Sequence, residues 1–204
     1  MIQSNFHAVL DTCVLLPMPL ADTLLRFAEE PRFYVPKWSA AILAELERNL
    51  VGKWNKSPEQ ASHRISQMNL AFPDATVRGY ESIVEAMQND ENDRHVLACA
   101  VLAGASVIVT NNTKHFTPKA LEPFGIEAQT PSQFLINAYD LNPAQAMTKL
   151  SRQAGAVHLT LESLLSRLGR SAPEFVRYIS EENGISIPCP TQAAGDPGAS
   201  GTAP

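Results

Sequence analysis

The sequence predicts an α/β fold in which a mostly parallel sheet of about five strands is covered by helices on both faces. Three observations support this prediction. Short apolar runs, typical of buried strands, alternate with longer segments whose apolar residues recur at helical spacing. The connections between these segments are short, as in the repeated strand and helix order of parallel sheets. The chain has 204 residues, 45% of them hydrophobic, which is enough for a substantial core.

The first predicted strand, residues 6–16, is a nearly continuous apolar run with Asp11 at its carboxyl end. Such a run is typical of a strand that is buried on both faces of a sheet. Four further segments are predicted as strands because they are short, apolar and bounded by turn residues. These are residues 32–36, 75–77, 107–109 and 125–128.

Helices are predicted between the strands from apolar stripes and from residues that favour helix N-termini. Ser39 precedes a stripe of apolar residues at helical spacing, and Ser57-Pro58-Glu59-Gln60 has the form of a capping box with proline at the first helical position. Thr130-Pro131-Ser132-Gln133 has the same form. The predicted helices are residues 17–30, 40–51, 58–70, 81–88, 91–103 and 134–139.

The last part of the chain is predicted to contain helices without strands. Residues 140–143 are the best candidate for a linker, and helices are predicted over residues 144–155, 161–168 and 173–182. This segment also holds the local excess of basic residues in the chain. A solvated helix face is the favoured explanation of such an excess, and RNA binding is the alternative.

We therefore expect a first domain of residues 1–139 and a small C-terminal helical domain of residues 140–184. Residues 185–204 are predicted to be a disordered tail, because a segment rich in Pro, Gly, Ala and Ser lacks the apolar side chains that would order it.

The composition restricts the class of protein and its compartment. A formal net charge of -5 argues against a protein that binds nucleic acid with its whole surface, although it permits local basic patches. The three cysteines, Cys13, Cys99 and Cys189, have no Cys-X-X-Cys spacing, which predicts reduced thiols and a cytoplasmic protein. The sequence has neither a long apolar run nor the pattern of a secretion signal, so we expect no membrane span and no export.

Asp11 is the first candidate for a functional residue. It ends a predicted buried strand, and ligands of open α/β sheets bind at that edge of the sheet. Because an unpaired buried charge costs several kcal/mol, we expect Asp11 to be paired or to coordinate a cation. The loop from Thr110 to Asn112 follows another buried strand and should reach the same edge, although Asn and Thr are also ordinary turn residues.

An acidic cluster that includes Asp90 and Asp93 precedes an apolar helix and has two interpretations. Asp90 can be the N-cap and Asp93 the third residue of that helix. Alternatively, other carboxylates converge on the same place. Like charges about 4 Å apart repel by roughly 4 kcal/mol at an effective dielectric constant of 20, and a divalent cation would remove that repulsion. Glu45 and Glu47 flank the apolar stripe of residues 40–51, and periodicity does not decide which one faces a cleft.

Together these segments resemble the PIN-domain ribonucleases, and most of all the bacterial VapC-like toxins. Val9-Leu10-Asp11-Thr12, the helix with Glu45, and Asp93-Arg94-His95-Val96-Leu97-Ala98 followed by Thr110-Asn111-Asn112 have the order and spacing of that family. The resemblance covers about residues 5–137. It implies a three-layer α/β/α domain whose acidic residues hold Mg²⁺ or Mn²⁺ and cleave RNA, and some relatives carry a similar C-terminal helical extension.

The resemblance also implies roles for individual residues. Asp11, Glu45 and Asp93 correspond to the metal ligands, which selects Glu45 over Glu47. Asn112 belongs to the same catalytic set but stands where many relatives have a fourth aspartate. The site would then have one negative charge fewer, so binding of a second metal ion is in question.

Further residues have auxiliary or binding roles in this interpretation. Asp90 is an additional acid or only the helix cap, and the Thr110 hydroxyl orients a ligand or a water molecule. Candidates for contacting RNA phosphates are basic or imidazole side chains, namely Arg94, Lys114, His115, Arg152, Arg167 and Arg170.

The expected function is hydrolysis of RNA by the toxin of a type II toxin–antitoxin pair, with RNA, a small antitoxin and a second copy of the chain as partners. A phosphatase of the haloacid dehalogenase type would need a second acid two residues after Asp11, where this chain has Cys13. The alternative is a PIN-fold binding or scaffold module with weak or no catalysis. Retention of three acids favours the enzyme, because buried unpaired carboxylates destabilise a fold without a cation.

Overall fold

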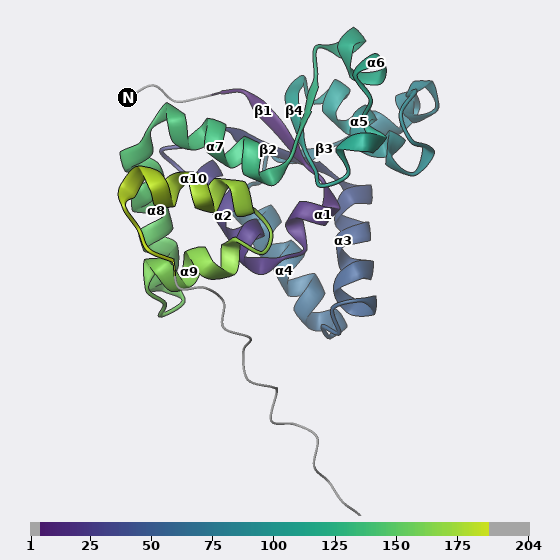
Figure 1. Ribbon diagram of the computed structural model, residues 1–204. Helices are drawn as coiled ribbons and strands as arrows, with labels where there is room; N and C mark the ends of the chain where they lie inside the picture. The colour runs from purple at the N-terminus through teal and green to yellow at the C-terminus, as the bar shows by residue number, and fades with distance from the viewer. Residues whose placement is uncertain (1–4, 188–204) are drawn as a thin grey trace, which may run out of the picture.

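The computed structural model describes residues 5–187, in which a five-stranded sheet lies between layers of helices (Figure 1). The strands are β1 (His7–Leu10), β2 (Val35–Ser39), β3 (Thr76–Val77), β4 (Ala105–Val109) and β5 (Glu127–Gln129). The helices up to the C-terminal segment are α1 (Thr12–Leu15), α2 (Met18–Ala28), α3 (Ala40–Gly52), α4 (Pro58–Ala71), α5 (Arg94–Leu102), α6 (Pro118–Leu121) and α7 (Pro131–Leu141). The C-terminal segment adds α8 (Pro143–Ala156), α9 (Leu161–Leu168) and α10 (Pro173–Asn183). Short 3₁₀ helices are η1 (Tyr80–Ala86), η2 (Glu91–Asp93), η3 (Thr113–His115) and η4 (Glu122–Phe124).

The strands pair in the order β3-β2-β1-β4-β5, and each pair is parallel. Ala8 in β1 lies opposite Pro36 of β2 on one side and Val107 of β4 on the other. The chain therefore adds strands outward from β1 in one direction and then continues on the opposite side with β4 and β5. Open α/β sheets bind ligands at such a reversal, outside the carboxyl ends of the strands.

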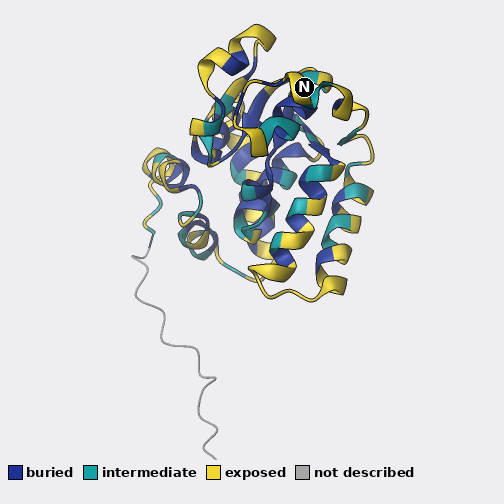
Figure 2. Ribbon diagram, turned by 90° about the vertical axis from the view of Figure 1, so that its right-hand side faces the viewer, coloured by how far each residue is buried: buried dark blue, intermediate teal, exposed yellow. Residues whose placement is uncertain are grey.

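Helices cover both faces of the sheet. Ala8 and Val9 are consecutive in β1, so their side chains point to opposite faces, and both are fully buried. Helix α5 contacts β1, β2 and β4, whereas α2 contacts β2 and α7 contacts β5. Figure 2 shows the buried strands enclosed by helices whose outer faces are exposed. The predicted three-layer α/β/α arrangement with a parallel sheet is therefore confirmed.

The helix starts predicted from capping residues are confirmed. Ser39 Oγ accepts a hydrogen bond from the Ile42 N–H at 3.2 Å at the start of α3. Ser57 Oγ accepts from the Gln60 N–H, and Gln60 Oε1 accepts from the Ser57 N–H, which completes the capping box of α4. Thr130 Oγ1 accepts from the Gln133 N–H at the start of α7. Each contact satisfies a backbone donor that has no partner within its own helix.

The prediction of one strand over residues 6–16 is wrong in its second half. Strand β1 ends at Leu10, and the apolar residues after Asp11 form the short helix α1. A continuous apolar run does not distinguish a buried strand from a buried helix, because both bury every side chain. Asp11 still lies directly after the strand, as predicted.

Two other predicted elements are displaced or different in type. The strand predicted over residues 32–36 begins only at Val35, because the Phe33 N–H donates to the Phe27 carbonyl and not to the sheet. The segment predicted as a helix over residues 81–88 is the 3₁₀ helix η1. Similarly, the helix predicted over residues 91–103 begins with the 3₁₀ turn η2 and continues as α5.

The C-terminal helices pack against α2 and α7. Helix α8 and helix α9 contact α2, and α10 contacts α7, which places this group on the side of the molecule away from α5 (Figure 1). The Phe27 and Phe175 rings meet edge to face with centroids 6.4 Å apart, and Thr23 Oγ1 donates to Gln153 Oε1 at 2.9 Å. These contacts join α8 and α10 to the core that α2 forms.

Lys149 contributes to this packing and not to an exposed basic face. Its side chain is 7% exposed, and its Nζ donates to the carbonyls of Arg26 and Glu29 at 2.8 and 3.0 Å. These carbonyls lie at the C-terminal end of α2, where backbone acceptors lack intrahelical partners and a cation is favoured. Burial lowers the pKa of this amine from its ordinary value.

The predicted linker is very short, since α7 ends at Leu141 and α8 begins at Pro143. The division into residues 1–139 and 140–184 remains a prediction, and most of the predicted tail, residues 188–204, lies outside the described residues. Among the helices of residues 5–187, none has the length and apolar character needed to cross a membrane.

Candidate active site

The loops after β1 and β4 meet at the carboxyl edge of the sheet, where the strand order reverses. Asp11 follows β1 and Thr110 follows β4, and the Asp11 N–H donates to the Val109 carbonyl at 3.1 Å. Because β1 and β4 are neighbours, their last residues bring two polar loops together. This is the position at which the sequence predicted a ligand site.

The Asp11 carboxylate is held by hydrogen bonds to one of its oxygens. The residue is 4% exposed, and its Oδ2 accepts from Thr110 Oγ1 at 2.7 Å and from Cys13 Sγ at 3.1 Å. Thr110 Oγ1 in turn accepts from the Asn112 N–H at 3.0 Å. Burial and the Asp11 charge raise the pKa of the Cys13 thiol to about 12, so the thiol keeps its proton near neutral pH.

Asp90, Asp93 and His115 form a second group at this edge. One ligand atom from each lies within 4.8 Å of the others, and in the part of the chain that the structure describes this is the one such trio of carboxylate, thiol or imidazole groups. His115 Nδ1 lies 2.6 Å from Asp93 Oδ2. The backbone fixes the group as well, because the Asp90 N–H donates to the His115 carbonyl at 3.2 Å.

The capping interpretation of the acidic cluster is confirmed for Asp90 only, and Asp93 precedes α5 and is not its third residue. Asp90 is the N-cap of η2, and its Oδ1 accepts from the Asn92 N–H at 3.1 Å. Asp93 immediately precedes α5 but makes no side-chain capping hydrogen bond. Asp93 is therefore not explained by helix capping, and its half-buried carboxylate faces His115 instead.

Glu45 lies on the wall of a cavity that Asp93 also lines. The cavity has a volume of about 500 Å³ and is lined by Ala41, Glu45, Arg48, Asn49, Asn92, Asp93 and His95. Glu45 Oε2 lies 3.9 Å from His95 Nε2, and Glu45 is half-buried whereas Glu47 is exposed. Helix α3 thus turns Glu45, and not Glu47, toward the edge of the sheet that carries Asp11, Asp90 and Asp93. We call this edge the acidic edge.

The remaining predicted residues lie in different surroundings. Asn112 is half-buried at the start of η3, Lys114 is exposed, and Arg94 Nη1 lies 3.8 Å from Glu85 Oε2. The three arginines proposed to bind RNA from the C-terminal segment are exposed, and they belong to α8, α9 and the turn after α9. They are Arg152, Arg167 and Arg170.

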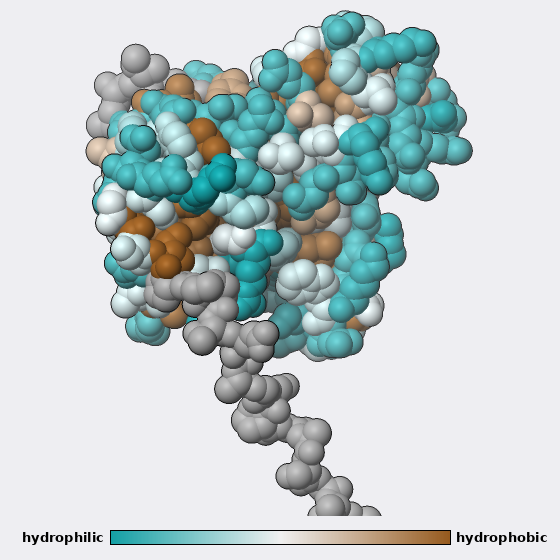
Figure 3. All heavy atoms as spheres, viewed as in Figure 1, coloured by the Kyte–Doolittle hydropathy of each residue, from teal (hydrophilic) through white to brown (hydrophobic). Residues whose placement is uncertain are grey.

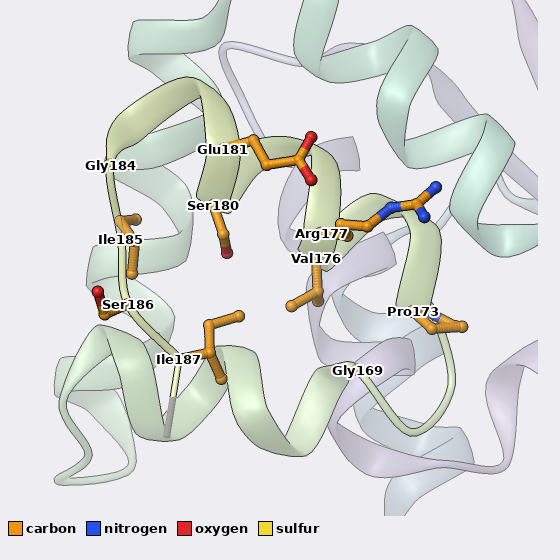
Figure 4. Close-up of a pocket in the computed structure, with 10 residues that line it drawn as sticks. All are labelled: Gly169, Pro173, Val176, Arg177, Ser180, Glu181, Gly184, Ile185, Ser186 and Ile187. Carbon is orange, nitrogen blue, oxygen red and sulfur yellow. The ribbon is translucent and has the colours of Figure 1, made fainter. Parts of the chain in front are cut away.

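A separate cavity of about 590 Å³ lies between α9, α10 and residues 184–187 (Figure 4). Val176, Ile185 and Ile187 line it, and the buried Ser180 hydroxyl points into it without a hydrogen-bond partner in the described chain. On the face drawn in Figure 3, hydrophobic residues gather over these C-terminal helices, whereas the surface over α5 and α6 is mostly hydrophilic. This cavity has one carboxylate on its wall, that of Glu181, and shares no residue with the acidic edge.

A model of the PIN domain matches residues 7–114, which is more than half of the chain. The matched segment begins at β1 and ends in η3, so it contains Asp11, Glu45, Asp93 and Thr110. This chain belongs to the PIN-domain family. The matched PIN segment includes strands β1 to β4. It excludes β5, α7 and the C-terminal helices.

A curated relative of this PIN domain is "Putative ribonuclease VapC50" of Mycobacterium tuberculosis (strain ATCC 25618 / H37Rv), which is 41% identical over 100 residues. That segment is 48% of this chain and 59% of the relative, so the match spans less than two thirds of the relative's length. No solved structure matches the chain.

The donor groups of this PIN domain fit a divalent cation. Asp90, Asp93 and Glu45 offer carboxylate oxygens, which suit Mg²⁺ and Mn²⁺, and His115 adds an imidazole nitrogen. Asp11 Oδ1 accepts no hydrogen bond from any of residues 5–187, so it also remains available as a ligand.

Sequence reasoning assigned no role in the site to two residues that contact its acids. The sequence predicts only a reduced thiol at Cys13, yet this thiol donates a hydrogen bond to Asp11, and its position two residues after the strand-end acid is the signal that indicates this contact. His95 lies in the first turn of α5, and its Nε2 is 3.9 Å from Glu45 Oε2. Neither contact follows from hydrophobic periodicity.

Proposed function

We propose that this PIN domain is a metal-dependent endoribonuclease that hydrolyses RNA phosphodiester bonds. One observation carries the proposal: Asp11 is fixed at the reversal of strand order, and the same edge of the sheet holds Asp90, Asp93 and His115 as a compact group. Carboxylates gathered at such an edge repel one another unless a cation binds. The ribonuclease name of the relative supports the same assignment.

In this proposal Asp11, Glu45 and Asp93 hold Mg²⁺ or Mn²⁺, with Asp90 as an auxiliary acid. When bound, such an ion polarises a phosphate and favours deprotonation of an attacking water. Asn112 takes the place of a fourth carboxylate, so one ion is expected in preference to two. The family's use of acidic residues is thus retained with one negative charge fewer.

The other residues of the edge position the acids and the RNA. Thr110 donates to Asp11 Oδ2 and keeps the carboxylate in one orientation. His115 contacts Asp93 Oδ2 and would restrict that side chain in the same way. Arg94 and Lys114 are near the site in sequence and are proposed to contact phosphates, because guanidinium and ammonium groups suit them. Arg152, Arg167 and Arg170 are proposed to hold structured RNA from the C-terminal helices.

The biological role proposed for the chain is that of the toxin of a type II toxin–antitoxin pair in the cytoplasm. A small antitoxin and a second copy of the chain are the protein partners expected from the resemblance to VapC-like proteins. The C-terminal helices, residues 140–184, are proposed to be a separate domain that adds to RNA binding.

The test is cleavage of total bacterial RNA by the purified full chain with Mg²⁺, with Mn²⁺ and with EDTA. Asp11→Asn and Asp93→Asn remove candidate ligands, and Asp74→Asn, an exposed acid beside β3, is the matched control. We expect discrete fragments with either metal and with Asp74→Asn, and none with EDTA or with the two site variants. Undiminished cleavage by both site variants would contradict the proposal.

Mn²⁺ binding distinguishes the enzyme from a scaffold module. If wild-type protein neither cleaves RNA nor gains thermal stability with Mn²⁺, the acidic edge is a metal-free scaffold and the proposed function is wrong. A gain in thermal stability with Mn²⁺ but no cleavage would support the metal site and would indicate that the right RNA was missing. Defined tRNA and ribosomal RNA substrates would then be tested.

A further inference from the structure

Asp11 Oδ2 accepts hydrogen bonds from two donors, one in helix α1 and one in the loop after β4. Cys13 Sγ donates to it at 3.1 Å and Thr110 Oγ1 donates to it at 2.7 Å. The Cys13 sulfur also accepts from the Asn111 N–H at 3.2 Å and lies 3.4 Å from Thr110 Oγ1. The thiol therefore has fixed contacts on two sides and joins helix α1 to the loop after β4.

These contacts make the two oxygens of Asp11 unequal. Oδ2 has two donors, whereas Oδ1 accepts no hydrogen bond from the described residues. An oxygen with two donors has its lone pairs occupied and is a poor ligand for a cation, while the other oxygen remains free. Hydrogen bonds of this kind fix the orientation of metal-binding side chains, and their loss commonly reduces metal affinity 10–100-fold.

We propose that Cys13 is a positioning residue for the active site, which fixes the Asp11 carboxylate so that Oδ1 alone binds the divalent cation. This inference rests on the proposed function, because it assumes that Asp11 is a metal ligand. It adds a residue that the resemblance to the PIN family did not supply.

The other described cysteine shows what a purely structural thiol looks like in this protein. Cys99 in α5 is fully buried and its thiol has no hydrogen-bond partner within residues 5–187. Cys13 is half-buried and has polar contacts with Asp11, Thr110 and Asn111. Removing each thiol in turn therefore separates a role in packing from a role in positioning Asp11.

The experiment measures Mn²⁺ binding to the full chain without RNA, by the electron paramagnetic resonance signal of free Mn²⁺. The variants are Cys13→Ala, which removes the donor, Cys13→Ser, which keeps one, and Cys99→Ala as the matched control. We expect Cys13→Ala to weaken Mn²⁺ binding roughly 10-fold or more and Cys13→Ser to stay within about threefold of wild type. Cys99→Ala should lower the melting temperature without changing Mn²⁺ affinity.

Cleavage provides a second readout. At a limiting Mn²⁺ concentration, Cys13→Ala should cleave RNA more slowly than wild type, and added Mn²⁺ should restore the rate. A variant damaged only in its packing would not recover with added metal. Melting temperatures of all variants in EDTA identify any that fail to fold.

Asp11→Asn distinguishes failure of this inference from failure of the proposed function. If Asp11→Asn weakens Mn²⁺ binding but Cys13→Ala does not, the role of Cys13 is refuted and the metal site stands. Equal weakening by Cys13→Ala and Cys13→Ser would also refute it. If Asp11→Asn leaves Mn²⁺ binding unchanged, Asp11 is not a ligand and both proposals fall. In the Asp11→Asn background, Cys13→Ala should have no further effect.

Discussion

The acidic edge of the sheet and the C-terminal helices place charged side chains in opposite ways. At the edge, ligand atoms of Asp90, Asp93 and His115 lie within 4.8 Å of one another, and the His115 imidazole contacts Asp93. On the C-terminal side, Lys149 is buried, and its Nζ donates to two backbone carbonyls at the end of α2. The acidic edge holds carboxylates of like charge close together, whereas the Lys149 ammonium group is paired with backbone hydrogen-bond acceptors.

This difference separates a charge that requires a ligand from a charge that the fold itself satisfies. Repulsion between neighbouring carboxylates is relieved by a cation, whereas two carbonyl acceptors within the fold stabilise the buried amine of Lys149. The local basic excess after residue 140 therefore includes a side chain with a structural role. Only the exposed basic residues of this segment, among them Arg152, Arg167 and Arg170, are accessible for the proposed contact with RNA.

The largest expected effect is the response of the acidic edge to a divalent cation. With free Mn²⁺ at 100 times its Kd, the free energy of unfolding should rise by about 2.7 kcal/mol, because the ion binds the folded state alone. Urea unfolding with Mn²⁺ and with EDTA measures this gain. Asp93→Asn should lose most of it and Lys149→Met should keep all of it. An equal gain in Asp93→Asn would place the ion elsewhere.

The opposite result is expected for Lys149. Lys149→Met keeps the length of the side chain but leaves the carbonyls of Arg26 and Glu29 without their donor. We expect the free energy of unfolding to fall by about 2 kcal/mol, while RNA cleavage by the folded variant is unchanged. Arg152→Met, from the exposed face of the same helix, is the matched control and should change stability by less than about 0.5 kcal/mol. Equal stability of the two variants would show that Lys149 is not a structural residue.

Thr110 tests how the edge holds a single acid. Thr110→Val preserves the shape of the side chain but removes the donor to Asp11 Oδ2, so Mn²⁺ affinity should fall about tenfold. Thr110→Ser retains a hydroxyl and should restore most of the affinity. Titration of each variant with Mn²⁺ checks this, and an unchanged affinity in Thr110→Val would mean that Cys13 alone is sufficient to orient Asp11.

The layers and the edge could be predicted from sequence because they follow from local patterns. Capping residues such as Ser39 and Ser57 marked helix starts, and apolar runs marked the strands that bury both faces. The position of Asp11 followed from its place after the first strand. The type of η1 and the start of β2 were not predictable, since they depend on contacts such as the Phe33 N–H to Phe27 bond.

The detailed contacts of the site depend on residues distant in sequence. The bond between Thr110 and Asp11 joins residues 99 positions apart, and the contact between His115 and Asp93 joins residues 22 apart. Periodicity describes only which face of an element a residue occupies. The buried position of Lys149 could not be predicted either, because its acceptors lie on α2, more than 100 residues earlier.

The smallest expected effect separates the two roles of Asp90. Asp90→Asn keeps an oxygen that can cap η2 but removes one negative charge beside Asp93. In EDTA the variant should be more stable than wild type by a few tenths of a kcal/mol, because exposed like charges repel weakly. With saturating Mn²⁺ the order should reverse, since wild type gains more from the ion. Paired unfolding curves in the two conditions measure this change of sign. If Asp90 were only a helix cap, the two proteins would unfold alike in both conditions, and the acidic edge would depend on Asp93, Glu45 and Asp11 alone.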